Sequence, residues 1–181
     1  YHIGLDDSAD DLVIGLGSAL GTTAHIVTDE NGHVTKPLQS GFIAQVSSEI
    51  SNVTGDNTAY TIAFDTEIVD RNADYNNSTY AFTAPVTGLY QITATAALLR
   101  CESDHDQVKL YANTSNRSRF LFMGSAATMR ETNGAGNLFI HGSATVDMDA
   151  NDTCDIGVQV YSGSKVVDMG DNAYFSAWLL G

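Results

Sequence analysis

Alternation of apolar and polar positions dominates the chain from about residue 41 to its end. Between residues 90 and 98, apolar Tyr, Ile, Ala and Leu alternate with Gln and Thr, and residues 138–148 and 156–160 repeat the period of two. The same period places Tyr60, Ile62, Phe64 and Ile68 on one predicted face. Turn-forming clusters separate these runs, and no segment keeps a helical period. Many short strands at this spacing predict an all-β fold, an antiparallel β-sandwich or jelly roll.

The last predicted strand, residues 174–180, breaks the alternation because both of its faces are largely apolar. A strand that is buried on both sides belongs in the centre of a covered sheet. One face would pack on the other sheet of the sandwich. We expect a partner subunit to cover the second face, and the alternative is that the N-terminal region folds over it.

Residues 1–37 lack the long alternating runs of the rest of the chain and consist of short, turn-rich pieces. The run Asp29-Glu30-Asn31-Gly32 predicts a tight hairpin turn, because Asn-Gly tolerates the positive φ that such turns need. Nearby glycines lack the spacing and the following helix of a nucleotide-binding loop. The segment is too small for a core of its own, so we expect it to pack against copies of itself. Two domains are therefore predicted, 1–37 and 41–181.

Charge excludes several classes of partner. The 181 residues include 22 acidic and 8 basic ones, a formal net charge of −14. Such a chain repels phosphate backbones and anionic membrane surfaces, so we expect no nucleic-acid partner. No apolar run approaches the roughly 20 residues of a membrane span, so no membrane insertion is expected. The chain starts at Tyr1 without a signal-like segment, and we expect it to be part of a longer polypeptide.

The two cysteines, Cys101 and Cys154, form neither a disulfide framework nor a zinc-ligand spacing. Each lies beside a predicted strand. We expect two buried free thiols, and a single bridge is the alternative if their strands are neighbours.

One stretch of the chain carries a recognisable motif. Phe64 and Asp74-Tyr75-Asn76 precede Tyr80-Ala81-Phe82-Thr83-Ala84-Pro85-Val86-Thr87-Gly88-Leu89-Tyr90. This order resembles the signature of the complement C1q globular head, which belongs with the tumour necrosis factor jelly rolls. Two further stretches are similar to the same family. They are Gly142-Ser143-Ala144 followed by Asn151-Asp152, and the terminal residues 174–180, with Asn151 and Ala177 where the family has glycine.

The resemblance covers residues 41–181 and implies a ten-stranded jelly roll that assembles as a compact trimer. It also implies ligand recognition through exposed loops, often with bound calcium, and no catalysis. Residues 1–37 contain none of the collagen-like Gly-X-Y repeats that usually precede such heads in animals, and instead look like shaft modules of bacteriophage fibres. Residues expected in the core or at the trimer contact are Phe64, Phe82, Tyr90, Tyr174, Phe175 and Trp178.

Three acidic clusters are candidate calcium sites, because calcium favours loops rich in oxygen ligands. No cofactor is required, and the residue pattern is not that of an EF-hand. The alternative interpretation is a set of solvated loops whose Asx side chains cap turns. The candidate metal ligands are Asp70, Asp74, Asp104, Asp106 and Asp171.

Target contacts are expected in the loops 70–78, 102–106, 130–137 and 162–172. Arg130 and Tyr75 are favoured as anchors, because Arg and Tyr are enriched at binding hot spots. The full set of candidates is Tyr75, Asn76, Asn77, His105, Arg130, Asn133, Ser164 and Lys165. No histidines pair at metal-site spacing and no Gly-x-Ser-x-Gly elbow occurs, so no catalytic residue is predicted. A sugar-cleaving enzyme would need two carboxylates that face each other in a groove.

The sequence thus favours a non-enzymatic homotrimeric head of a viral, most simply phage, fibre. It would lie on the virion surface and bind a host glycan or protein. The first alternative is a secreted, extracellular C1q-like recognition protein that binds microbial surfaces. The second is a purely structural capsid decoration, for which trimer stability would be the whole role.

Overall fold

Two compact units make up the chain, Tyr1–Ser40 and Gly41–Gly181. The computed structural model describes residues 1–132 and 134–180. The first unit is a four-stranded antiparallel sheet in the order β1-β2-β3-β4. Its strands are β1 (His2–Asp6), β2 (Asp11–Leu16), β3 (Thr23–Thr28) and β4 (Val34–Thr35). The predicted hairpin turn joins β3 to β4, with Gly32 at φ 84° and its N–H bonded to the carbonyl of Asp29.

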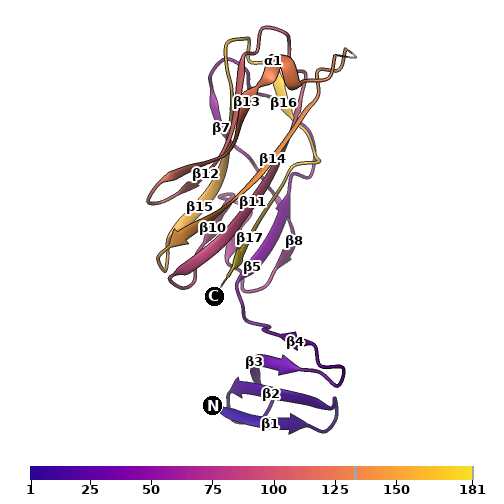
Figure 1. Ribbon diagram of the computed structural model, residues 1–181, viewed down its shortest axis with the longest axis vertical. Helices are drawn as coiled ribbons and strands as arrows, with labels where there is room; N and C mark the ends of the chain where they lie inside the picture. The colour runs from indigo at the N-terminus through magenta and orange to yellow at the C-terminus, as the bar shows by residue number, and fades with distance from the viewer. Residues whose placement is uncertain (133, 181) are drawn as a thin grey trace. The chain divides into compact units, whose positions relative to one another are not determined.

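The second unit is an antiparallel β-sandwich, as the alternation predicted (Figure 1). One sheet runs β13-β12-β15-β10-β9, with β7 also paired to β15. Its strands are β7 (Ala59–Thr61), β9 (Tyr75–Asn76), β10 (Ala81–Thr83), β12 (Gln107–Thr114), β13 (Ser118–Ser125) and β15 (Thr153–Val160). A single short helix, α1 (Ala126–Met129), follows β13 in the described residues.

The second sheet runs β6-β16-β11-β17-β5-β8, with β14 also paired to β11. Its strands are β5 (Gly41–Gln45), β6 (Ile50–Thr54), β8 (Thr66–Asp70), β11 (Gly88–Leu99), β14 (Leu138–Met148), β16 (Val167–Met169) and β17 (Tyr174–Leu179). In residues 1–132 and 134–180, no helix is long and apolar enough to cross a bilayer.

The core lies between the two sheets and is rich in aromatic rings. Phe42 stacks on Tyr75, with ring centroids 4.5 Å apart, and meets Phe175 edge to face at 4.8 Å. Such pairs add to the free energy gained by burying the rings. Phe64, Phe82, Tyr90 and Phe175, all expected in the core or at a trimer contact, are fully buried here.

The final strand, β17, lies between β11 and β5, at an interior position of its sheet. Phe175 and Ala177 point into the core, whereas Tyr174, Ser176 and Trp178 lie on the opposite, outward face. Tyr174 is exposed and Trp178 half-buried. The doubly apolar pattern of this strand therefore reflects one core face and one outward face.

Two local predictions from the sequence were wrong. Ile68 does not share the core face of Ile62 and Phe64, because the chain leaves the sheet between β7 and β8 and Ile68 is 54% exposed. The predicted loop 162–172 contains the buried strand β16, which extends the second sheet. In contrast, Asn151 adopts the left-handed φ (74°) expected of a residue that replaces glycine.

Candidate functional site

Three of the four predicted contact loops gather at one end of the sandwich. The segment 100–106 joins β11 to β12, 126–137 leads from β13 to β14, and 161–166 follows β15. These strands pair antiparallel, so the three connections emerge at the same end, near α1 in Figure 1. The fourth loop lies at the opposite end, because Asp70 pairs with Phe42 at the start of β5. We call the three gathered loops the apical loops.

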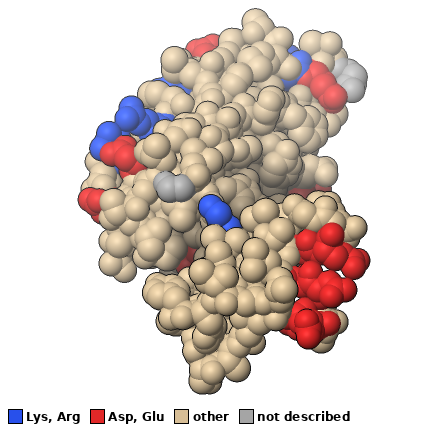
Figure 2. All heavy atoms as spheres, turned by 60° about the horizontal axis from the view of Figure 1, so that its bottom comes forward, with Lys and Arg blue, Asp and Glu red and all other residues tan. Residues whose placement is uncertain are grey.

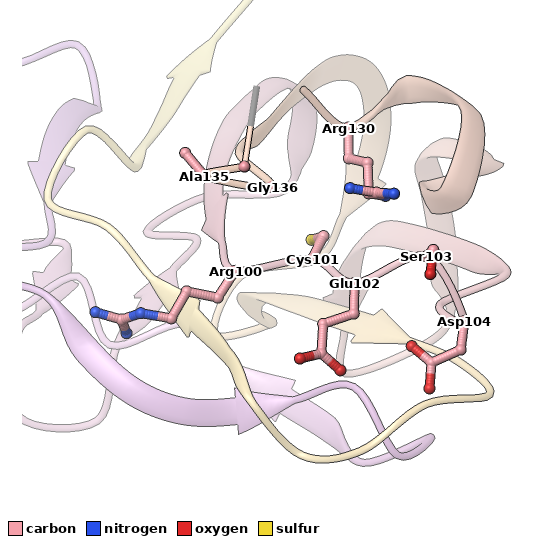
Figure 3. Close-up of a pocket in the computed structure, with 9 residues that line it drawn as sticks. Arg100, Cys101, Glu102, Ser103, Asp104, Arg130, Ala135 and Gly136 are labelled. Carbon is pink, nitrogen blue, oxygen red and sulfur yellow. The ribbon is translucent and has the colours of Figure 1, made fainter. Parts of the chain in front are cut away.

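A hollow of about 600 Å³ opens among the apical loops (Figure 3). One wall is the segment from Arg100 to Asp104, and the other consists of Arg130 and the glycine-containing stretch 134–136. The backbone N–H of Cys101 donates a hydrogen bond of 2.9 Å to the carbonyl of Gly136, which ties the two walls together. A backbone hydrogen bond therefore fixes the two walls of the hollow relative to each other.

Arg100 fixes the base of one wall. Its φ of 60° is unusual for a residue with a side chain. Its guanidinium forms an ion pair with the buried carboxylate of Asp168 and a second one, at 3.0 Å, with Glu49. Asp168 also accepts a 2.6 Å hydrogen bond from the backbone N–H of Asn52. These contacts pair the positive charge of Arg100 with carboxylates of the same chain and join the loop 100–106 to β16.

His105 is fully buried beneath the same loop. Its Nδ1 accepts a 2.7 Å hydrogen bond from the backbone N–H of Glu102, and its Nε2 lies 3.1 Å from the carbonyl oxygen of Ser164. Because a carbonyl can only accept, Nε2 is the donor in this contact. His105 thus links two apical loops, and the expectation that it is an exposed contact was wrong.

Cys101 lies in the floor of the hollow as a buried free thiol, and Cys154 is likewise free and buried in the core. The first expectation for both residues is therefore confirmed, and no bridge joins them. Burial raises the pKa of Cys101 to about 11, although the nearby positive charge of Arg130 acts in the opposite direction. A neutral thiol is a poor nucleophile, so Cys101 does not suit covalent catalysis.

Arg130 faces Cys101 and the 100–104 segment across the hollow, as Figure 3 shows. Its Nε is buried without a hydrogen-bond partner, and its Nη1 makes one long contact, 3.5 Å, to the carbonyl of Glu131. Among the described residues no carboxylate forms an ion pair with it. The carboxylates of Glu102 and Asp104 point away from it in Figure 3. Arg130 therefore keeps donors that the protein does not use.

The other predicted contact residues have varied surroundings. Tyr75 is buried, and its hydroxyl donates a 2.8 Å hydrogen bond to the carbonyl of Phe64, so its prediction as a surface anchor was wrong. Asn76 and Asn77 are exposed at the end opposite the apical loops. Ser164 and Lys165 are exposed in the apical loops. Asn133 lies outside the described residues.

The five candidate metal ligands do not form a shared cluster. Asp104 and Asp106 are apical and Asp70 and Asp74 lie at the opposite end, while Asp171 follows β16. The carboxylate of Asp70 accepts hydrogen bonds of 3.1 Å from the backbone N–H groups of Asp74 and Tyr75, as a turn-capping Asx residue does. Within the part of the chain that the structure describes, no three His, Cys, Asp or Glu residues come together to hold a metal ion. The contacts of Asp70 favour the alternative interpretation of turn-capping loops, and calcium binding itself is untested.

Sequence reasoning missed the roles of Arg100 and Asp168. Asp168 looked like a loop acid, and the buried strand that contains it has only three residues. The available signal was the apolar Val166-Val167 pair directly before it, which favours a strand.

Comparison with known proteins agrees with this architecture. The globular domain of zebrafish complement 1qA protein is similar over 79% of this chain and 98% of its own, with 16% identity and a TM-score of 0.50. Murine APRIL is similar over 78% of this chain and 99% of its own, with 8% identity and a TM-score of 0.51. No curated protein matches the sequence. The C1q domain profile matches residues 41–180, and the chain therefore belongs to the C1q domain family.

Proposed function

We propose that the protein is a non-enzymatic, homotrimeric binding head whose apical loops contact the target. C1q domains are typically binding modules and often form trimers. The observation that carries the proposal is the outward face of the second sheet, formed by β5, β17, β11 and β14. We call it the assembly face.

The assembly face is nearly free of charge in a strongly acidic chain. Among the outward residues of these four strands, only Asp147 and His141 interrupt the apolar, hydroxyl and amide side chains. Two charged side chains from outside these strands, Arg71 over Trp178 and Asp171 beside Tyr174, lie next to them. Tyr174 and Phe139 are 45% and 53% exposed on it, and a groove of about 340 Å³ lies beside Ile43, Ile68 and Tyr174. A monomer with 22 acidic residues would be expected to place some of them here. Depletion of charge with exposed aromatics is typical of the buried centre of an interface.

A second apolar patch lies on the edge strand β13. Phe120 and Met123 are 63% and 56% exposed there. The edge patch of one copy can bind the assembly face of a neighbouring copy. Such a contact is heterologous, and it closes into a ring when the rotation between copies allows. A ring of three copies fits this pair of surfaces, and C1q domains often form trimers.

The first unit also exposes an apolar face. The register places Ile3 opposite Ile14 and Leu5 opposite Leu12, and Ile3 and Leu5 are each 70% exposed. A small sheet without a covering layer is marginally stable in water. Three copies that share this face would bury it. The connection from β1 to β2 is acidic, with Asp6, Asp7, Asp10 and Asp11 at or beside it. Figure 2 shows one dense group of acidic side chains on the surface.

We place this head at the end of a viral, phage-like fibre on the virion, where it would bind a host-surface glycan or protein. The β-rich first unit, with its apolar face and without Gly-X-Y repeats, supports a fibre shaft. The second candidate is a secreted C1q-like recognition protein, which the likeness to the complement protein head favours.

Light scattering on the purified chain tests the assembly. We expect a mass three times the 19.3 kDa of one chain. A monomeric mass at micromolar concentration would overturn the trimer. The coding sequence upstream of Tyr1 separates the two settings, because a fibre shaft or virion genes would support the first, and a collagen-like stretch the second.

A further inference from the structure

We propose that the apical hollow binds a carboxylated sugar, a ring that carries one carboxylate and several hydroxyl groups, with Arg130 as the carboxylate-binding residue. This inference rests on the proposed binding function and names its ligand class. It is carried by the unused donors of Arg130 and by the polar groups that surround them.

Arg130 is held ready for an anion. The buried Nε–H without a partner is a cost that a ligand would remove, since a buried donor left unpaired lowers stability. Arg100, in the same hollow, has two acidic partners, whereas Arg130 has none among the described residues. A guanidinium presents parallel N–H donors that match the two oxygens of a carboxylate.

The surroundings of Arg130 select for hydroxyl groups beside that carboxylate. Glu102, Ser103 and Asp104 line the opposite wall, with both carboxylates turned away from Arg130 (Figure 3), and among the described residues no side-chain hydrogen bond occupies any of them. Carboxylates accept hydrogen bonds but cannot donate them, so their partners must be donors such as sugar hydroxyls. Most small-molecule pockets are lined mainly by apolar groups, and this hollow is not, which favours a strongly polar ligand.

The same two acids disfavour ligands with several negative charges. A phosphate or sulfate polymer would bring its charges close to Glu102 and Asp104, on a chain with a net charge of −14. Repulsion between like charges near a surface is of the order of several kcal/mol at contact. A sugar with one carboxylate per ring places that charge at Arg130, so less negative charge lies close to Glu102 and Asp104.

Hydrogen bonds also hold the walls of the hollow in place, which suits the binding of a rigid sugar ring. The wall opposite Asp104 contains Gly134 and Gly136, and the Cys101–Gly136 hydrogen bond fixes its distance from the first wall. His105 holds the 100–106 loop from below. A site that is already ordered loses less entropy on binding.

Calorimetry on the trimeric full chain tests the proposal with methyl β-D-glucuronide, N-acetylneuraminic acid and neutral methyl β-D-glucoside as probes. We expect at least one acidic sugar to bind at millimolar concentration or below, and the glucoside to bind about 10-fold more weakly or not at all. Which acidic sugar binds distinguishes a uronic acid from a sialic acid. Affinity should fall as salt is raised, because the ion pair is partly screened.

Arg130→Gln should weaken binding of the acidic sugar about 10-fold or more, and Arg130→Lys should weaken it less. Arg119→Gln, on β13 outside the hollow, is the matched control and should bind as the wild type does. Equal binding of the glucoside, unchanged binding by Arg130→Gln, or tighter binding of an acidic peptide would overturn the proposal. So would the absence of binding by every sugar probe in a sample that light scattering shows to be trimeric, a result that leaves the assembly proposal intact.

Discussion

The indole ring of Trp178 lies against the backbone of Gly41, its register partner on β5, at the outward face of the second sheet. A Cβ at position 41 would overlap the six-membered part of the ring. The guanidinium of Arg71 lies over the ring, 5.5 Å from its centroid. The half-buried state of Trp178 is therefore set within one chain, by its contacts with Gly41 and Arg71.

Gly41→Ala should displace the ring of Trp178 and lower the free energy of unfolding by about 1–3 kcal/mol, as overpacking does. Trp178 is the only tryptophan, so its fluorescence reports the displacement directly. Urea titrations followed by fluorescence measure both effects. Gly170→Ala is the milder comparison and should cost less, because a Cβ there would lie 3.3 Å from the end of the flexible Leu99 side chain, whereas at position 41 it would overlap the indole ring. Equal stability and an unchanged emission maximum in Gly41→Ala would contradict the packing described.

The sandwich could be predicted from the sequence because its strands bury one face each. The alternation at 90–98 and 138–148 matches the inward residues of β11 and β14. The predicted turns at Asn31-Gly32 and Asn151 also formed, since these residues tolerate positive φ. Local chemistry decides such features, so a single sequence contains enough information to predict them.

The site was harder to predict because its parts come from distant segments. Tyr75 looked like a surface anchor, yet the space above Phe42 takes its ring and the carbonyl of Phe64 takes its hydroxyl. His105 looked like a loop residue, but its partners are 3 and 59 positions away. Composition cannot show whether a polar side chain finds a buried partner across the fold.

His105→Ala should destabilise the head by about 2–4 kcal/mol, because it opens a cavity and leaves the N–H of Glu102 and the carbonyl of Ser164 unpaired. Hydrogen exchange should rise first in segments 100–106 and 161–166. Ser103→Ala, an exposed change in the same loop, should cost less than about 0.5 kcal/mol. Similar exchange rates in His105→Ala and the wild type would show that the ring does not hold the two loops together.

Ser176→Arg should dissociate the trimer without unfolding the chain. Ser176 lies at the middle of the assembly face, between Thr93 and Ile43, and its side chain points out of the core. Three buried arginines without partners would cost several kcal/mol at the interface. Light scattering should then report a monomer with the circular dichroism of the wild type.

Thr61→Arg, an exposed position on β7 in the other sheet, which pairs with β15 and not with β13, is the matched control for Ser176→Arg and should stay trimeric. A Ser176→Arg trimer as stable as the wild type would place the contact elsewhere.

Calcium should change the melting temperature of the protein by less than about 1 °C, because one or two carboxylates in water hold this ion weakly. Asp70 already caps a turn, and Asp104 and Asp106 are exposed without a third acidic partner among the described residues. Melting curves with millimolar calcium or EDTA measure the shift. A rise of several degrees that EDTA reverses, and that Asp104→Asn removes, would establish a site at the apical loops.

Stability should fall as pH rises above about 8.5, because of the two buried thiols. Burial raises the pKa of Cys101 to about 11 and that of Cys154 to about 12. In the unfolded chain both thiols ionise near pH 8.5, so above that pH the unfolded state binds fewer protons than the folded state. The stabilising effect of burying neutral thiols is therefore complete below about pH 8.5 and is lost as pH rises through the folded values.

Urea midpoints at pH 8, 8.5 and 9 measure this loss, below the range where the partly buried tyrosines Tyr60, Tyr75, Tyr90 and Tyr111, whose pKa values burial also raises, begin to contribute. The double variant Cys101→Ala, Cys154→Ala should show a shallower decline than the wild type, whatever its stability at pH 8. A thiol reagent should label neither cysteine in the native protein at pH 8 and both in urea. Rapid labelling of the native protein, or equal pH slopes in the two proteins, would mean that the thiols are not buried as neutral groups.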